Sequence, residues 1–487
     1  MVESVREQDM ARYHADIAPT DSTHRTWNFY NYLSLWIGMA HNIPTYLMAG
    51  GFIALGMSWW QAILTVLLGN LIVLVPILLN SHPGTKYGIP FPVLVRSSFG
   101  VVGAGVPALL RALVAAGWFG IETAIGGEAI QTFLLLLIPG WAHFSNIFTF
   151  VGMNLGGWIS FMLFWFLNIW IIYHGIDAVR RFEAWAGPLV LVLGVGLLIW
   201  AVSAAHGFGP ILSQPGKLHG GQLWAVFIPA LTSVVGFWAT LSLNIPDFTR
   251  FARNQKSQAW GQALGLPTTM TVFSAIGVLV TSATIVVFHQ AISDPITLLG
   301  MSHNPILLVI SLGAVVVATL SVNVAANVVS PAYDFIQLFP KHLNFQRGGL
   351  VTGILGIVMV PWLLISNPHI YIFSWLNVYS GFLGPIAGIM IADYWVFRRQ
   401  TLMVAELYDK TGRYFYQNGY NPLALWSLAA GIVVSLIGKV MPALAWLFSY
   451  SWFVGFAVAF LVYLVLMRRR YPVGAPAGVE ATTKPIA

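Results

Sequence analysis

A carboxylate and an indole ring stand four residues apart in a long apolar stretch. Trp118 and Glu122 lie near the middle of residues 101–137. Residues four apart share one face of a helix, and an ionisable group inside an apolar span usually has a function or a partner. A ring plane beside a carboxylate acceptor suits a flat heterocycle that carries N–H groups. Pairing of Glu122 with Arg111 or His41, for structure alone, is the alternative.

A second pair of polar residues has the same spacing. Asn323 and Asn327 lie in another apolar stretch, with small alanines between them. An amide donates and accepts at once, which matches the edge of a pyrimidine or a purine. The alternative is hydrogen bonding between helices, and it weighs more for Asn323 than for Asn327.

Two apolar stretches contain residues that interrupt a helix. Residues 38–44 include His41 and Asn42 before a proline, and residues 232–238 end in Phe237 and Trp238. A broken helix is tolerated in a membrane only where it is buried or lines a cavity. Interruptions five helices apart indicate an inverted repeat with the substrate site at the breaks. A plain kink in each helix is the alternative.

The composition shows which elements must position these groups. Of 487 residues, 57% are hydrophobic and only 8% are charged, and Cys is absent. A soluble enzyme and a disulfide scaffold are therefore excluded, as are thiolate catalysis and Cys-held metal sites. Windows long enough to cross a bilayer predict an all-α polytopic protein with twelve transmembrane helices, near 29–54, 59–80, 101–137, 155–174, 186–205, 222–246, 267–289, 305–334, 350–366, 369–396, 422–440 and 443–467.

The basic residues predict the orientation. With both ends in the cytoplasm, 20 of the 23 Lys and Arg fall in cytoplasmic segments, as the positive-inside rule requires. We therefore expect a multi-pass protein of the cell (inner) membrane, with the lipid bilayer rather than nucleic acid as its surroundings. The expected organisation is a cytoplasmic tail (1–28), two five-helix repeats (29–205 and 222–396), helices eleven and twelve (422–467) and a second cytoplasmic tail (468–487), which we expect to be disordered from about Tyr471.

Other chemistries find little support. No Gly-Lys-Ser/Thr phosphate loop occurs, which excludes ATP-driven transport within this chain. Only His41 among the histidines lies deep in a window, so a metal site is not expected, and no nucleophile–base pair suggests an enzyme. No repeated pore loop suggests a channel.

Six strings in one order resemble the nucleobase:cation symporter-1 family. They are LWIGMAHNIPTY (35–46), GTKYGIPFPV (84–93), GWFGIET (117–123), LNIPDFTRF (243–251), NVAANVVSPAY (323–333) and LGPIAGIMIADY (383–394). The resemblance implies a LeuT-like five-plus-five inverted repeat followed by two C-terminal helices. It also implies inward, cation-coupled transport of uracil, cytosine, purines, allantoin or hydantoins by alternating access.

The resemblance also assigns residues. Trp118 and Trp238 match the aromatic clamps of the family, Glu122 and Asn327 match the groups that bind the edge of the ring, and Asn42 matches a polar position at the first break. The cation site of the sodium-coupled members falls on Gly38, His41, Ala318 and Ser321. By analogy of fold, gates are expected near residues 44–46 and 376–380.

Two departures from the family favour one branch of it. The hydantoin and allantoin branches carry Gln where this chain has Glu122, and the sodium-coupled members have a second hydroxyl where this chain has Val322. One lost oxygen weakens a Na⁺ site, and removal from water disfavours a charged carboxylate. We therefore expect import of uracil or a purine with a proton, through Glu122 and His41, by a monomer without a cofactor. Sodium-coupled import of allantoin or hydantoin is the alternative.

Overall fold

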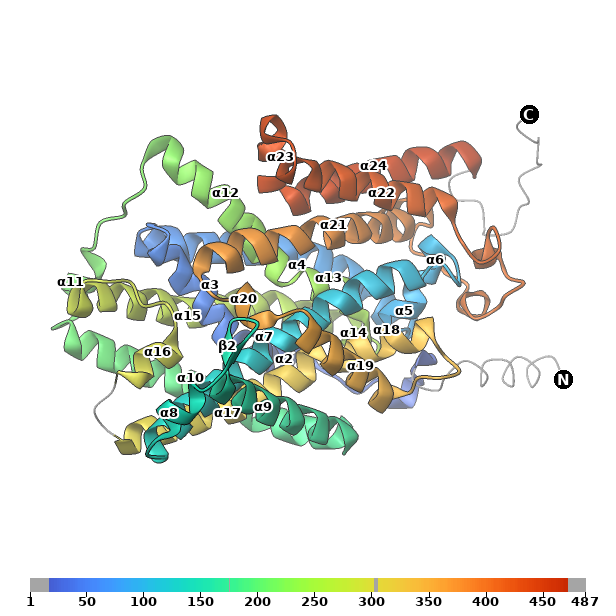
Figure 1. Ribbon diagram of the computed structural model, residues 1–487. Coiled ribbons are helices and arrows are strands. Elements are labelled where there is room, and N and C mark those ends of the chain that lie inside the picture. The colour runs from blue at the N-terminus through green and yellow to red at the C-terminus, as the bar shows by residue number, and fades with distance from the viewer. Residues whose placement is uncertain (1–16, 175, 302–304, 472–487) are drawn as a thin grey trace.

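The computed structural model describes residues 17–174, 176–301 and 305–471, which are almost entirely helical (Figure 1). In this described part, nine helical segments are long and apolar enough to cross a membrane, and three shorter apolar helices occupy the remaining predicted windows. The nine are Trp59–Tyr87, Gly105–Leu137, Leu155–Tyr173, Gly220–Phe237, Gln255–Phe288, Leu308–Leu338, Ile370–Phe397, Pro422–Lys439 and Ser451–Arg470, and the three are Ile43–Ala54, Leu191–Ala204 and Phe345–Val358.

The first predicted helix is broken where the sequence indicates. Helix α2 (Phe29–Ala40) ends before His41, and α3 (Ile43–Ala54) begins after Asn42. The Asn42 side chain accepts a hydrogen bond from the Thr45 amide and so caps α3, while Pro44 stands in its first turn, where no amide hydrogen is needed.

The sixth predicted helix is broken at Trp238, between α12 (Gly220–Phe237) and α13 (Ala239–Asn244). A further break at Val328 was not predicted. It separates α17 (Pro305–Asn327) from α18 (Val329–Leu338). The tenth window holds α21 (Asn377–Ile391) between two π-helical segments, η3 (Ile370–Leu376) and η4 (Ala392–Phe397).

The helix contacts follow a five-plus-five pattern. Helix α4 (Trp59–Tyr87) packs on α12 and α13, and α15 (Gln255–Phe288), five places later, packs on α2 and α3. Helix α10 (Ile176–Ala204), the fifth of the first half, packs on α2. Its counterpart in the second half, η3 with α21, packs on α12 in the same way. Helix α7 (Gly105–Leu137) packs directly on α17, its own counterpart. Exchange of the two halves therefore preserves the contacts.

The helices fall into two packed groups. One group contains α2, α3, α4, α12, α15 and the short helices α13 and α14 (Pro246–Thr249). The other contains α7, α9 (Leu155–Tyr173), α17, α18 and α19 (Phe345–Val358). Helices α10 and α21 each contact both groups. The two breaks with predicted binding residues lie in the first group and face the second.

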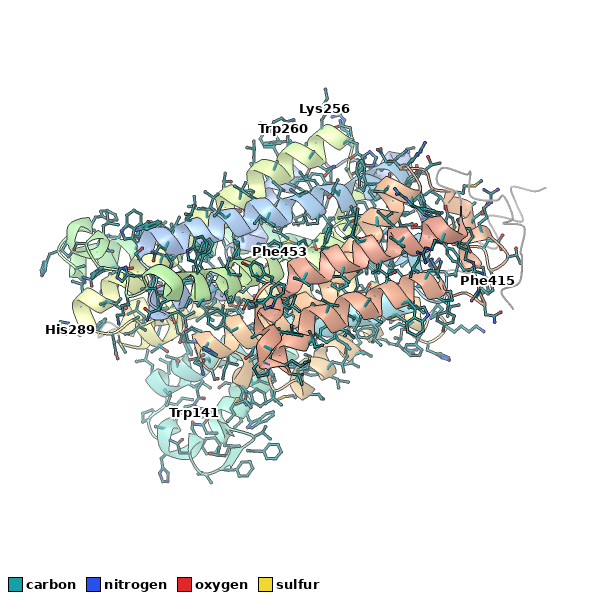
Figure 2. The ribbon with its side chains drawn as sticks, turned by 90° about the horizontal axis from the view of Figure 1, so that it is seen from above. Trp141, Lys256, Trp260, His289, Phe415 and Phe453 are labelled. Atoms are coloured by element: carbon teal, nitrogen blue, oxygen red, sulfur yellow. The ribbon has the colours of Figure 1, made fainter. Side chains whose placement is uncertain are left out.

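The remaining elements cover the ends of these groups. Helices α22 (Pro422–Leu436) and α24 (Ser451–Arg470) pack on α21. The hairpin of β1 (Thr149–Phe150) and β2 (Met153–Asn154), with α8 (Trp141–Ser145), projects from the bundle around Trp141 in Figure 2. Short helices complete the chain: η2 (Ser22–His24), α5 (Phe91–Leu94), α6 (Arg96–Phe99), α11 (Phe208–Leu212), α16 (Pro295–Gly300), α20 (Pro361–Leu364), η5 (Val404–Leu407), η6 (Arg413–Phe415), η7 (Ile437–Lys439), η8 (Pro442–Leu444) and α23 (Ala445–Ser449).

Both described ends of the chain lie at one end of the bundle (Figure 1). The segment between η4 and α22 contacts both described ends of the chain. Its Tyr408 hydroxyl donates to the Ile17 carbonyl at 2.7 Å, and its Asn421 contacts Met467 on α24. This common end is the one that carries Arg398 and Arg413. The predicted disordered tail after Tyr471 lies outside the described residues.

Candidate functional site

Three of the predicted aromatic residues form one continuous group. The rings of Trp118 and Phe237 meet edge to face with centroids 4.9 Å apart, and Phe237 and Trp238 meet at 5.0 Å. All three are buried. Trp238 also packs against Trp36 of α2 at 5.1 Å. Phe237 thus bridges the two tryptophans that were predicted to clamp a substrate, and it joins α7 to the break after α12.

Helix ten supplies aromatic residues that the sequence analysis missed. Tyr371, Trp375 and Tyr379 each lie with their edges toward Trp118, at centroid distances of 6.2, 6.3 and 6.3 Å. Their spacing of four residues is the signal that could have identified them as one helix face. The absence of a side chain on Gly117 admits Trp375, since a Cβ there would lie 2.3 Å from its ring.

The Glu122 carboxylate lies one helical turn from Trp118 and is only 2% exposed. Its Oε2 atom has no hydrogen-bond partner in the part of the chain that the structure describes. The Tyr371 hydroxyl is close enough to interact with this carboxylate electrostatically. Arg111 does not neutralise it, because Arg111 forms an ion pair with Asp334 of α18. The alternative of a structural Glu122–Arg111 pair is therefore wrong in this structure.

The two asparagines of α17 have different partners. Asn323 donates to the Phe119 carbonyl at 3.2 Å and to the Thr123 hydroxyl at 3.3 Å, so it links α17 to α7. Asn327 donates to the Asn323 side-chain oxygen at 3.1 Å. The structural alternative thus describes Asn323, and Asn327 is the more accessible amide, at 9% exposure.

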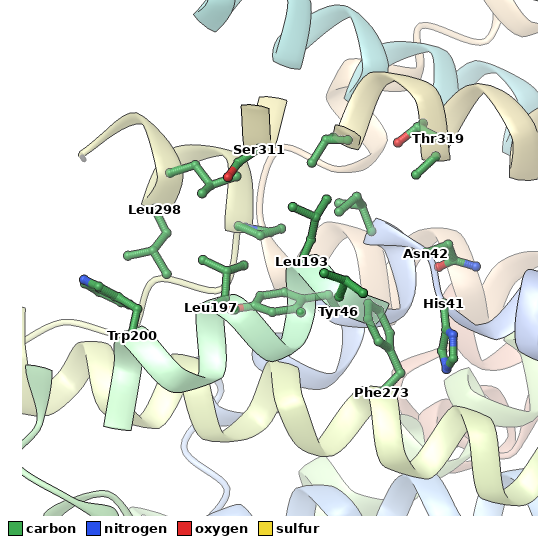
Figure 3. Close-up of a pocket in the computed structure, with 18 of the residues that line it drawn as sticks. His41, Asn42, Tyr46, Leu193, Leu197, Trp200, Phe273, Leu298, Ser311 and Thr319 are labelled. Atoms are coloured by element: carbon green, nitrogen blue, oxygen red, sulfur yellow. The ribbon is translucent and has the colours of Figure 1, made fainter. Parts of the chain in front are cut away.

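The break of the first helix opens onto a cavity of about 490 Å³ between α10, α15 and α17 (Figure 3). His41, Asn42, Ala318 and Val322 line it. Of the four predicted cation-site residues, His41 and Ala318 therefore share this cavity, whereas Gly38 and Ser321 are not among the residues that line it. The remaining walls are mostly apolar: Leu193, Leu197, Trp200, Phe273 and Leu298 surround the space in Figure 3.

Two polar side chains at this break are engaged locally. The Asn42 amide donates to the Met39 carbonyl at 2.6 Å and accepts from the Thr45 amide at 2.7 Å. The His41 ring packs against Phe273 with centroids 5.1 Å apart. Asn42 thus holds the two half-helices together. Val322 presents methyl groups to the cavity where a cation would need oxygen.

The common end of the bundle holds a buried polar network. Asn244 of α13 donates to the Ser330 hydroxyl of α18 at 2.6 Å and to Asp247 at 3.4 Å. Asp247 also accepts from the Phe91 amide at 2.8 Å and interacts with Arg111. These contacts join the two helix groups between the aromatic residues and the end of the bundle where both described chain ends lie. No cluster of metal-ligating side chains occurs among the described residues.

A family model described as "Permease for cytosine/purines, uracil, thiamine, allantoin" matches residues 19–455. An allantoin permease of Bacillus subtilis is 45% identical over 94% of this chain and 93% of its own length. A purine-uracil permease of Arabidopsis thaliana is 42% identical over 93% of this chain and 77% of its own length.

Two solved structures of one transporter have a similar fold. The inward-facing conformation of Mhp1 matches with a TM-score of 0.79 and 25% identity, over 95% of this chain and 96% of that one. Mhp1 in a closed conformation with bromovinylhydantoin bound, described as a nucleobase-cation-symport-1 family transporter, matches with the same score and identity over 96% and 98%. The inverted-repeat fold expected from the sequence is confirmed, whereas the count of twelve spanning helices stays a prediction.

Proposed function

The chain belongs to the family of permeases for cytosine and purines, uracil, thiamine and allantoin, and on that premise we propose that it imports uracil or a purine base together with a proton. It is a multi-pass membrane permease rather than an enzyme. The finer statements, on substrate, coupling ion and placement in the inner membrane with both ends in the cytoplasm, are the content of the proposal.

The observation that carries the proposal is the environment of Glu122. An acceptor carboxylate with an oxygen to which no described residue donates lies one helical turn from Trp118, whose ring meets Phe237 and the aromatic face of helix ten. A flat ring gains dispersion energy between such side chains, and an N–H group satisfies the oxygen, which is costly to leave unpaired. The amide of Asn327 offers a complementary donor and acceptor.

A proton is the favoured coupling ion because of two groups. Glu122 is buried and unpaired by a cation, so a bound proton removes the cost of its charge. Val322 faces the cavity beside His41 and Ala318 and supplies no oxygen to a metal ion there. A proton could therefore enter with the substrate on Glu122, with His41 as a second titratable group near the break.

Movement between the two helix groups would give alternating access. In this arrangement, the Tyr371 hydroxyl donates to the Pro44 carbonyl at 3.3 Å on one side of the aromatic residues. The Asn244–Ser330 contact joins the groups on the other side. Release of one contact at a time would open the site to one side only, and a single chain contains all the parts.

Sodium-coupled import of allantoin is the second candidate, and the 45% identity to an allantoin permease favours it. Uptake of radiolabelled uracil into proteoliposomes, with adenine, guanine, cytosine, allantoin and hydantoin as competitors, separates the two. We expect a nucleobase to compete best, uptake to persist without Na⁺, and the medium to become alkaline as substrate enters. Competition by allantoin or hydantoin alone, with strict dependence on Na⁺, would replace the proposal by the second candidate.

A further inference from the structure

A second cavity, of about 420 Å³, lies toward the end of the bundle opposite the chain ends. It is lined by α3, α7, α9, α16, α20 and the segment after α20, which gather around the β1–β2 hairpin in Figure 1. Its polar wall contains Glu128, Gln131, Asp294, Thr297 and Ser366, and Phe161 and Trp362 contribute rings. None of these residues belongs to the site described above.

The two carboxylates in this wall, Glu128 and Asp294, differ in location from most acidic residues of the chain. Of the 16 acidic residues, all but Glu122, Glu128 and Asp294 fall in segments that the orientation assigns to the cytoplasm or, like Asp334 and Asp393, toward the cytoplasmic ends of predicted windows. Glu128 and Asp294 are 166 positions apart in the chain, yet they line one cavity and interact electrostatically. The fold thus gathers the acidic groups of the outer half of the protein in a single recess.

The bonding of these groups indicates what they can hold. Asp294 already accepts from the Ile296 and Thr297 amides at 3.1 and 3.0 Å, and the Gln131 oxygen accepts from Trp141 and Ser160 at 3.0 and 3.1 Å. No hydrogen bond or ion pair of Glu128 with another described residue is recorded, and Glu128 is an exposed residue of the cavity wall. A hard cation requires several free oxygens around it, whereas one free carboxylate suffices for an N–H donor.

The walls favour a planar ligand. Phe161 and Trp362 meet edge to face at 5.5 Å and form an aromatic surface, and Leu47, Ile125 and Ile365 add apolar contacts. A free carboxylate beside aromatic rings is the combination that Glu122 and Trp118 present deeper in the protein. The same chemical class therefore fits both places.

We infer that this cavity is an outer binding site for the transported heterocycle, occupied before the central site. Leu47 and Ile125 lie between the outer cavity and the central site. Ile125 follows Glu122 by one helical turn. Leu47 follows Pro44 by one turn, and the Pro44 carbonyl accepts a hydrogen bond from Tyr371. The outer site lies on the outer side of Leu47, Ile125 and the Tyr371–Pro44 contact. It holds its ligand through a hydrogen bond from a ligand N–H group to Glu128. This inference rests on the proposed function, because it takes the transported compound as the ligand.

Equilibrium binding of radiolabelled uracil and of allantoin, to purified protein in lipid nanodiscs, tests the inference. We expect the wild type to bind a second molecule per chain that Glu128→Gln and the cavity-filling variant Ser366→Trp do not bind. Ser213→Trp is the matched control, because Ser213 and Ser366 each donate to the carbonyl three residues earlier and Ser213 lies away from the cavity. In uptake, the KM of Glu128→Gln should rise about tenfold, as loss of a charge-assisted hydrogen bond implies.

Equal binding numbers in the wild type and Glu128→Gln, with uptake intact, would overturn the inference and leave the proposed function standing. A change confined to the affinity for Na⁺ would also overturn it, since the cavity would then be a cation site. If the wild type neither bound nor accumulated any of the heterocycles, the proposed function itself would fail, and the outer site with it. Glu122→Gln should keep the outer molecule while losing affinity at the central site.

Discussion

The Glu122 oxygen to which no described residue donates is the most informative atom of the site. Burial of an unpaired carboxylate is costly, and the one arginine of the same helix is held by Asp334 instead. Substrate and proton are the groups that could satisfy it during transport. Selectivity and coupling are therefore expected to depend on this one side chain.

Glu122→Gln should shift the preference from nucleobases toward allantoin and hydantoin. An amide oxygen accepts more weakly than a carboxylate, and the amide nitrogen now donates to the carbonyl groups of a ureide. We expect at least about a tenfold loss in nucleobase affinity. Competition uptake measures this, with Glu406→Gln, in the ion pair with Arg413, as control. Unchanged selectivity would mean that Glu122 does not contact the substrate.

Val322→Ser should make uptake respond to Na⁺. The hydroxyl would enter the cavity that His41 and Ala318 line and restore an oxygen there. Val317→Ser is the matched control, because Val317 lies on the same helix, is 39% exposed and does not line this cavity. Uptake at graded Na⁺ concentrations is the measurement. Equal responses of both variants would argue against a cation site at this position.

Among the elements, the interrupted helices decide what can move. The two half-helices at His41 and Asn42 are joined by side-chain caps rather than by a continuous backbone ladder. The π-helical segment η3 carries Tyr371 and Trp375 over the aromatic residues. The hydrogen bond from Tyr371 to the Pro44 carbonyl connects η3 to α3, so that its loss should bias the opening of one side.

Tyr371→Phe should favour opening toward the outer side. It removes the hydroxyl that donates to the Pro44 carbonyl and retains the ring beside Trp118. A net loss of about 1 kcal/mol corresponds to roughly fivefold in an equilibrium. Because the chain has no cysteine, a single Leu47→Cys reporter can be labelled specifically. The rate at which an impermeant maleimide labels it from outside measures the opening toward the outer side. Slower labelling than in the reporter alone would contradict the prediction.

Ser330→Ala should have the opposite effect. It breaks the contact from Asn244 between α13 and α18 but leaves the bond from Asn244 to Asp247. We expect faster labelling of a Thr240→Cys reporter from the cytoplasmic side and slower labelling of Leu47→Cys from outside. Faster labelling from both sides would indicate general loosening rather than a shift between two states.

At the scale of the whole molecule, two packed groups of helices meet through few polar contacts. The buried pair of Arg111 and Asp334 stands at this boundary and also faces Asp247 of the other group. Loss of the Asp334 charge would leave Arg111 facing Asp247 without its direct ion pair, and breaking a buried pair in this way costs more than removal of both of its charges.

Asp334→Asn should therefore lower the stability of the protein by about 3 kcal/mol. The double variant Arg111→Met with Asp334→Leu should recover much of that loss. Thermal unfolding of the purified protein in detergent measures both, with Asp409→Asn, in the connection between η5 and η6, as control. If the double variant is no more stable than Asp334→Asn, the ion pair is not the source of the effect.

The sequence alone predicted the membrane-spanning windows, the orientation, the broken first and sixth helices and the importance of Trp118 and Glu122; the structure confirms both breaks, whereas the orientation stays a prediction. These features are local, because span length, basic flanks and helix interruption depend on neighbouring residues. The resemblance to the family added the inverted repeat, which the structural comparisons confirm. The residue roles and the coupling ion stay predictions.

Only the tertiary structure decided which groups meet. Arg111 pairs with Asp334 and not with Glu122, Asn323 bonds to α7, and the face of Tyr371, Trp375 and Tyr379 covers Trp118. Each contact joins helices far apart in the chain. Helix crossing geometry fixes such contacts, and no periodicity within one segment contains that information. The outer cavity arose the same way, when folding brought Asp294 to Glu128.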